Sequence, residues 1–93
     1  MGYQVDEAFT FAYRAVREKA PSASGVYTIY SSQRWVYVGE SDNIRQSLFR
    51  HLNEPNARMN QFGALSFSFE MAPAVERVSR QHVLVAELKP ACN

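Results

Sequence analysis

Residues 25–39 read GVYTIYSSQRWVYVG and predict a β-hairpin. Two runs rich in β-branched and aromatic residues, 26–30 and 35–38, are separated by four polar residues. Such runs favour strands, and a short polar segment between them is typical of a hairpin turn. Each run contains a tyrosine, Tyr27 in the first and Tyr37 in the second. The hairpin therefore fixes where these two tyrosines lie relative to one another.

The segments on either side of the hairpin predict helices and one more strand. The expected elements are, in chain order, a helix over about 6–19 capped by Asp6, strands over 25–30 and 35–38 with Gly39 ending the second, a helix over 42–53 capped by Ser41, a loop over 55–63, a strand over 65–71 and, from near Pro73, a helix over 74–88. Helical spacing of apolar residues marks the helices, and alternation of apolar and polar residues marks the last strand. The predicted fold class is α/β (α+β): a small sandwich whose three-stranded, antiparallel-containing sheet is flanked by helices.

The composition is that of one small globular domain. The chain has 93 residues, of which 46% are hydrophobic, and a net charge of +1. No apolar run approaches the roughly 20 residues of a membrane span, and the start of the chain lacks the apolar segment of a signal peptide. The single cysteine, Cys92, excludes a disulfide framework. We expect a cytoplasmic protein without membrane contact, in which 1–23 is an N-terminal helical extension of a core over 24–93.

Further polar residues, with apolar neighbours between them, recur at regular spacing after the hairpin. The positions of interest are Asn43, Ile44, Arg45, Ser47, Arg50 and His51 in the second helix, and Gln81, Leu84, Val85, Pro90 and Asn93 near the C-terminus. Spacings of three and four residues place Asn43, Ser47, Arg50 and His51 on one helix face. Gln81 shares a face of the last helix with apolar residues, and an inward polar side chain needs a partner or a wet groove. We expect both sets beside a groove on the sheet.

Together with Tyr27, Tyr37 and Gly39, these residues resemble the GIY-YIG nuclease family over 24–93. The resemblance implies a metal-dependent phosphodiester hydrolase in which a glutamate holds one divalent ion and an arginine steadies the phosphate. It implies site roles for Tyr27, Tyr37, His51 and Asn93, whose types match the motif. It also implies that two positions are substituted, since Ser47 stands where the family has the arginine and Gln81 where it has the glutamate.

The two substitutions remove the charges that the chemistry needs. A hard cation prefers an anionic oxygen ligand, and Gln81 is neutral. Ser47 is short and uncharged, and losing one electrostatic donor typically costs about 3 kcal/mol of transition-state stabilisation. We therefore expect no tightly bound metal, with Mg²⁺ or Mn²⁺ relevant only to residual cleavage. Asn43, Arg45 and Arg50 are the expected nucleic-acid contacts.

Three functions remain open from the sequence. The favoured one is a degenerate nuclease-like domain that binds DNA or RNA and cleaves weakly or not at all. The second is an active endonuclease, either with displaced groups such as Arg50, Glu40 or Glu87, or as an engineered Glu-to-Gln variant at position 81. The third is a scaffold that binds a protein partner, which the small net charge favours. In the first two functions, six motif side chains are expected to converge on one groove. They are Tyr27, Tyr37, Ser47, His51, Gln81 and Asn93.

Overall fold

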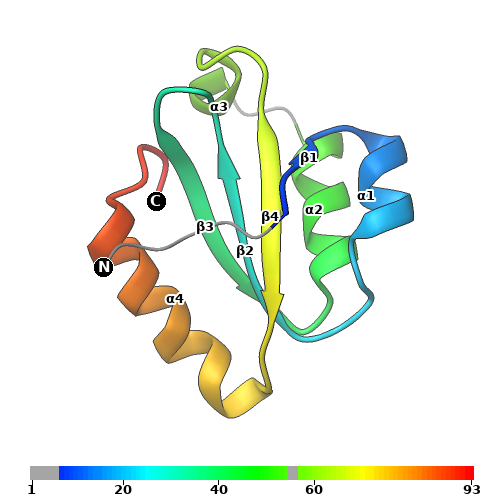
Figure 1. Ribbon diagram of the computed structural model, residues 1–93, viewed down its shortest axis with the longest axis vertical. Helices are drawn as coiled ribbons and strands as arrows, with labels where there is room; N and C mark the ends of the chain where they lie inside the picture. The colour runs from blue at the N-terminus through cyan, green and yellow to red at the C-terminus, as the bar shows by residue number, and fades with distance from the viewer. Residues whose placement is uncertain (1–6, 55–56) are drawn as a thin grey trace.

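The structure is a computed structural model that describes residues 7–54 and 57–93. Its hairpin forms as the sequence predicts, with strand β2 (Gly25–Tyr30) antiparallel to strand β3 (Trp35–Ser41) (Figure 1). A backbone hydrogen bond of 2.9 Å closes the polar turn between them. The two tyrosine runs are therefore neighbouring strands of one sheet.

Gly39 lies inside β3, so the expected end of the strand at this residue is wrong. It pairs with Tyr27 across the hairpin, and the strand continues to Ser41. A Cβ atom on Gly39 would come within 2.4 Å of the Tyr27 hydroxyl oxygen. The tyrosine ring thus occupies the space that a side chain would need, and the glycine serves this close approach rather than a chain break.

The sheet has four strands in the order β1-β4-β2-β3, and every neighbouring pair is antiparallel. Strand β4 (Ser66–Met71) joins the same sheet, as the sequence predicts, and pairs with the side of β2 that faces away from β3. Strand β1 (Phe9–Thr10) adds a short fourth strand on the other side of β4. The predicted fold class is confirmed, with one strand more than expected.

The predicted helix over 6–19 is wrong in its first half. The chain is extended at β1, and helix α1 spans Tyr13–Lys19, while Asp6 lies outside the described residues. The Phe9 ring packs against Phe67 of β4, with ring centroids 5.4 Å apart. An open edge of β4 offers backbone hydrogen bonds that no local sequence pattern reveals, so pairing there overrides the helical spacing.

Helix α2 (Ile44–Asn53) begins two residues later than predicted. Its N-cap is Asn43, whose side-chain oxygen accepts a hydrogen bond of 3.0 Å from the Gln46 amide. The expectation that Ser41 caps this helix is wrong, because Ser41 is the last residue of β3 and its hydroxyl bonds the backbone of Asn43. An asparagine at the N-cap satisfies one free amide of the first turn equally well.

Two further helices follow. A single turn, α3 (Ala57–Asn60), lies within the stretch expected to be a loop. Helix α4 (Ala74–Leu88) has the predicted bounds, and Pro73 directly precedes it. None of the described helices has the length and apolar character that a membrane span requires.

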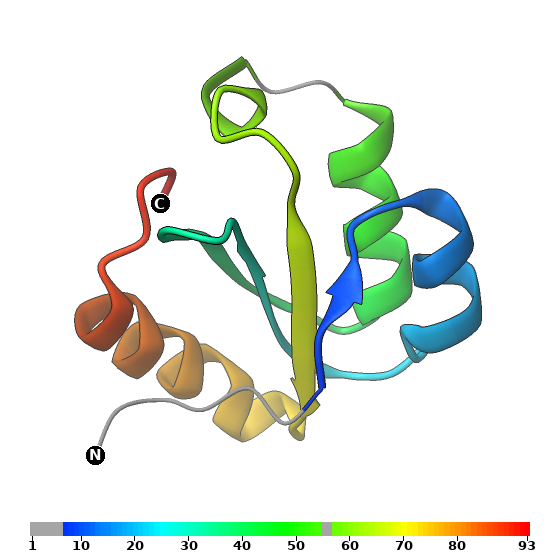
Figure 2. The same ribbon diagram turned by 45° about the horizontal axis from the view of Figure 1, so that its top comes forward.

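The helices cover both faces of the sheet, α1 and α2 on one side and α4 on the other (Figures 1 and 2). The larger core lies under α1 and α2, and a smaller cluster lies under α4. The larger cluster includes the buried side chains of Val16, Tyr27, Ile29, Ile44, Leu48 and Phe67, and the smaller one consists of Val26, Val38 and Leu84. Tyr27 consequently faces α2, while Val38 faces α4.

Candidate nucleic-acid interface

The centre of the candidate site is the pair Tyr27 and Tyr37. Tyr27 pairs with Gly39 and Tyr37 pairs with Ile29, so the two tyrosines are diagonal neighbours on the same face of the hairpin. Their ring centroids are 6.1 Å apart. The register thus places both tyrosines on one face of the predicted hairpin.

His51, in the last turn of α2, completes an aromatic cluster with the tyrosines. Its Nε2 lies 2.9 Å from the Tyr27 hydroxyl oxygen, and its ring centroid lies 4.8 Å from that of Tyr37. Burial lowers the pKa of His51 below its ordinary 6.5, and Arg50 lowers it further while Glu54 opposes the change. A neutral imidazole has one donor and one acceptor nitrogen, so the tautomer of His51 sets the direction of its hydrogen bond with the Tyr27 hydroxyl.

The Tyr27 phenol is held in its protonated form. Burial raises the pKa of Tyr27 well above its ordinary value of 10.0, and the nearby Tyr37 and Glu40 raise it further, whereas Arg50 lowers it. A buried phenolate would lack solvation, and its charge would be repelled by that of the Glu40 carboxylate. Tyr27 is therefore a neutral phenol at this site rather than a resident phenolate.

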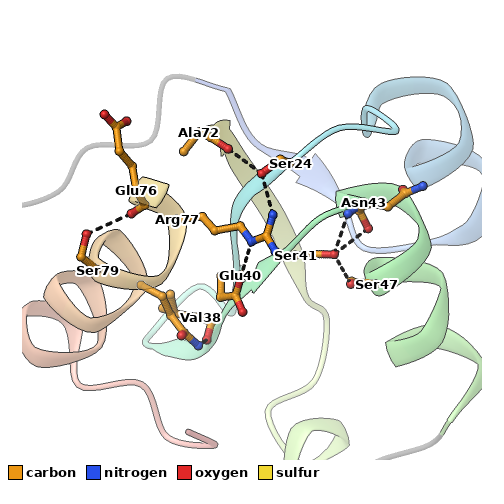
Figure 3. A network of polar contacts seen from close by, with 11 residues as sticks. Ser24, Val38, Glu40, Ser41, Asn43, Ser47, Ala72, Glu76, Arg77 and Ser79 are labelled. Atoms are coloured by element: carbon orange, nitrogen blue, oxygen red, sulfur yellow. Dashed lines mark hydrogen bonds and ion pairs between the residues drawn. The ribbon is translucent and has the colours of Figure 1, made fainter. Parts of the chain in front are cut away.

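Ser47 lies one turn before His51 on the same face of α2, as predicted. Its side chain is buried and donates a hydrogen bond of 2.6 Å to the Ser41 hydroxyl at the end of β3 (Figure 3). Ser41 in turn donates to the Asn43 carbonyl at 2.8 Å and accepts from the Asn43 amide at 2.9 Å. This chain of neutral hydrogen bonds joins the start of α2 to β3.

Gln81 and Asn93 both bind the backbone of Val38, between the second tyrosine and Gly39. Gln81 Nε2 donates to the Val38 carbonyl at 3.2 Å. Asn93 makes two bonds of 2.7 Å, donating to the same carbonyl and accepting from the Val38 amide. Both side-chain amides therefore contact β3 at its backbone and not at its side chains. The six motif side chains form two groups joined by this strand, one around the tyrosines and α2 and one at Val38.

The donors present do not fit a tightly bound divalent cation. Gln81 offers a neutral carbonyl, and the Asn93 oxygen already accepts from Val38. Glu40, the nearest candidate for a displaced carboxylate, pairs with Arg77 at 2.6 Å, and Glu87 is exposed on α4. Among residues 7–54 and 57–93, no three His, Cys, Asp or Glu side chains are grouped to hold a metal.

Arg77 was not singled out by the sequence. It lies one turn before Gln81 on α4, and besides Glu40 it donates a bond of 3.0 Å to the Ser24 hydroxyl (Figure 3). Ser24 donates to the Ala72 carbonyl at 2.7 Å. The network ties α4 to the beginning of β2 and the end of β3. Spacing of four residues from Gln81 was the only sequence signal for it.

The three predicted nucleic-acid contacts have different surroundings. Asn43 caps α2, and Arg45 Nε donates to the Ala20 carbonyl at the end of α1, 2.8 Å away. Arg50 is exposed and precedes His51, and within the described chain no hydrogen bond or ion pair engages its guanidinium. Arg50 is thus the arginine of α2 whose charge is available to an incoming anion.

This chain is similar in sequence and in fold to known proteins. No family model matches the chain. UvrABC system protein C of Hydrogenobaculum sp. (strain Y04AAS1) is 30% identical over 71 residues, which are 76% of this chain and 13% of that protein. The chain therefore spans only a small part of this relative's length.

Solved structures give the same result at the level of fold. The magnesium-bound GIY-YIG N-terminal endonuclease domain of UvrC from Thermotoga maritima superposes with a TM-score of 0.68 and 21% identity, over 84% of this chain and 94% of that one. A point mutant of that domain, also bound to its catalytic divalent cation, superposes with a TM-score of 0.64 over 82% and 91%. The family resemblance of the sequence motifs is confirmed, and this chain is a domain of the GIY-YIG fold.

Proposed function

We propose that this domain binds nucleic acid at the face formed by Tyr27, Tyr37 and His51 and cleaves phosphodiesters weakly or not at all. The observation that carries the proposal is the state of the two substituted positions. Ser47 donates its hydroxyl to Ser41, and Gln81 donates its amide to the Val38 carbonyl. Neither supplies charge to a phosphate or a metal ion, which phosphoryl transfer requires.

Binding is supported by the groups that remain. The Tyr27 and Tyr37 rings and the His51 imidazole lie together, and Arg50 adds a positive charge that has no ion-pair partner among residues 7–54 and 57–93. Arginine forms charge-assisted hydrogen bonds with phosphate oxygens. The relatives are UvrC proteins, and the endonuclease activity named for their domain supports nucleic acid as the ligand class.

Binding is tested by its salt dependence. We expect the unaltered chain to bind short DNA or RNA with an affinity that falls as salt rises, because phosphate contacts release counterions. Arg50→Ala should reduce the slope of log affinity against log salt by about 1. Arg17→Ala, on the exposed surface of α1, is the matched control and should leave the slope unchanged. Salt-independent binding, or none, would contradict the proposal.

Restoring the missing charges tests the loss of cleavage. The double change Ser47→Arg with Gln81→Glu should raise Mg²⁺- or Mn²⁺-dependent cleavage at least about a hundredfold, and each single change much less, since the groups serve one transition state. Adding Tyr27→Phe to the repaired chain is the control and should remove the gain. Cleavage by the unaltered chain as fast as by the repaired one would show that displaced groups perform the chemistry.

Metal binding provides a readout that does not depend on cleavage. Gln81→Glu places a carboxylate opposite the Val38 carbonyl and loses the bond that Gln81 makes there. Mg²⁺ should therefore raise the melting temperature of this variant and leave that of the unaltered chain unchanged. Circular dichroism would show whether the double variant folds, since Ser47 is buried and arginine needs more room.

A further inference from the structure

A cavity of about 390 Å³ adjoins His51 on the side of α3 and β1. Its apolar wall consists of Phe11, Leu52, Met59 and Leu65, which come from four different segments of the chain. The last turn of α2 and the single turn α3 lie at the same end of the molecule (Figure 2). The volume lies within the usual range of ligand pockets, and a mostly apolar wall is typical of them.

The cavity also presents unused hydrogen-bonding groups. Thr10 and Asn60 line it, and within the described part of the chain neither side chain makes a hydrogen bond. An amide such as that of Asn60 can donate and accept at once, which matches the edge of a nucleobase. His51 lines the same cavity, so its ring is shared with the tyrosine pair.

The charge around the cavity favours a ligand attached to phosphate. None of the residues that line it is acidic. Arg50, exposed and without a partner in the described chain, directly precedes His51. A flat aromatic group in the cavity would therefore lie next to a site for an anion.

We propose that this cavity receives one unpaired nucleobase of a nucleic acid whose adjoining phosphate lies at Arg50 and His51. The inference rests on the proposed function and specifies its ligand as a strand with at least one unpaired base. Bases within a duplex are stacked and paired, so only a single-stranded, bulged or extruded base can enter such a pocket. The apolar wall would cover the faces of the base, and Asn60 would contact its edge.

The test uses oligonucleotides that carry 2-aminopurine, a fluorescent adenine analogue, at one position. We expect its fluorescence to change on binding when the analogue is unpaired in a single strand or a bulge, and to stay constant when it is paired in a duplex. Replacing that nucleotide by an abasic site should weaken binding at least about fivefold, because stacking of one base contributes this much or more. Equal affinity for the abasic and base-containing strands would overturn the pocket and leave nucleic-acid binding intact.

Variants separate the pocket from the phosphate contact. Ala64 lines the cavity on an exposed loop, so Ala64→Trp should fill the cavity, abolish the fluorescence change and lose the preference for a base over an abasic site. Asn60→Ala should weaken base-dependent binding several-fold. The exposed Ala86 on α4 provides the control Ala86→Trp, which should change neither. An unchanged base preference in Ala64→Trp would reject the pocket, whereas failure of every strand to bind the unaltered chain would reject the proposed function with it.

Discussion

At the scale of single residues, the hydrogen bond between Tyr27 and His51 couples the site to pH. His51 is neutral in the free protein because burial lowers its pKa, whereas unfolding restores the ordinary 6.5. The unfolded chain therefore binds more protons than the folded one as pH falls below about 6.5, and this histidine lowers the stability of the free domain there. A bound phosphate acts in the opposite direction, since a nearby negative charge favours the imidazolium.

Nucleic-acid affinity should rise as pH falls from 8 to 5.5. The bound phosphate raises the pKa of His51 above its lowered free value, so the complex takes up a proton and acid favours it. Fluorescence anisotropy at constant ionic strength measures the effect. His51→Gln should flatten the profile, while His82→Gln, on the exposed surface of α4, should retain it. A rise of equal size in His51→Gln would assign the proton to another group.

Gly39 should be intolerant of even a methyl group. In Gly39→Ala the new Cβ would meet the Tyr27 ring at 2.4 Å, and Tyr27 is buried, so the ring must move. We expect a loss of about 1–3 kcal/mol in unfolding free energy. Urea denaturation measures this, and NMR of the His51 ring would report the loss of its bond to Tyr27. A variant with unchanged stability and an unchanged His51 signal would show that the ring has free space to move into.

At the scale of elements, β3 is an edge strand that the C-terminal residues cover. Ala91 and Cys92 donate backbone hydrogen bonds to the carbonyls of Trp35 and Val36, at 3.1 and 2.8 Å. Asn93 then makes both of its bonds to Val38. Its carboxamide makes the two hydrogen bonds, one as donor and one as acceptor, that the backbone of a further strand would make. The motif asparagine therefore positions β3, and with it the second tyrosine, through the backbone.

Asn93→Ala should loosen β3 locally. Removing two hydrogen bonds is expected to cost about 1–3 kcal/mol, and the Val38 amide should exchange its hydrogen much faster. Hydrogen exchange followed by NMR measures the local effect, and urea denaturation the global one. Gln61→Ala, an exposed amide elsewhere, is the control. Val38 exchange that stays as slow as before would mean that other contacts hold this edge.

The sequence patterns predicted correctly those elements whose structure depends mainly on residues near in sequence. The hairpin, β4 and α4 follow from alternation, helical spacing and Pro73, and their predicted bounds are close to those observed. Strand β1 was missed because only the open edge of β4 makes its extended form favourable. Gly39 was misread for a related reason, since the neighbour that makes glycine necessary lies on another strand.

At the scale of the whole molecule, the sequence predicted one groove for all six motif side chains, whereas Gln81 and Asn93 lie at the Val38 backbone and the other four lie around the tyrosines and α2. Helical spacing on α2 and the family motif indicated Tyr27, Tyr37, Ser47 and His51. The bonds of Ser47 to Ser41 and of Gln81 to the Val38 carbonyl depend on how helices on opposite faces meet one strand. The cavity beside His51 is likewise formed by segments far apart in the chain, and no short pattern encodes it.

The covered edge of β3 also bears on how copies of this domain behave in concentrated solution. An open edge strand invites strands from other molecules to add to the sheet, the first step toward aggregation. Here one outer strand, β1, is only two residues long, and the opposite one is occupied by Ala91, Cys92 and Asn93. The asparagine beside the candidate site thus also helps to keep this small sheet from growing into a larger one.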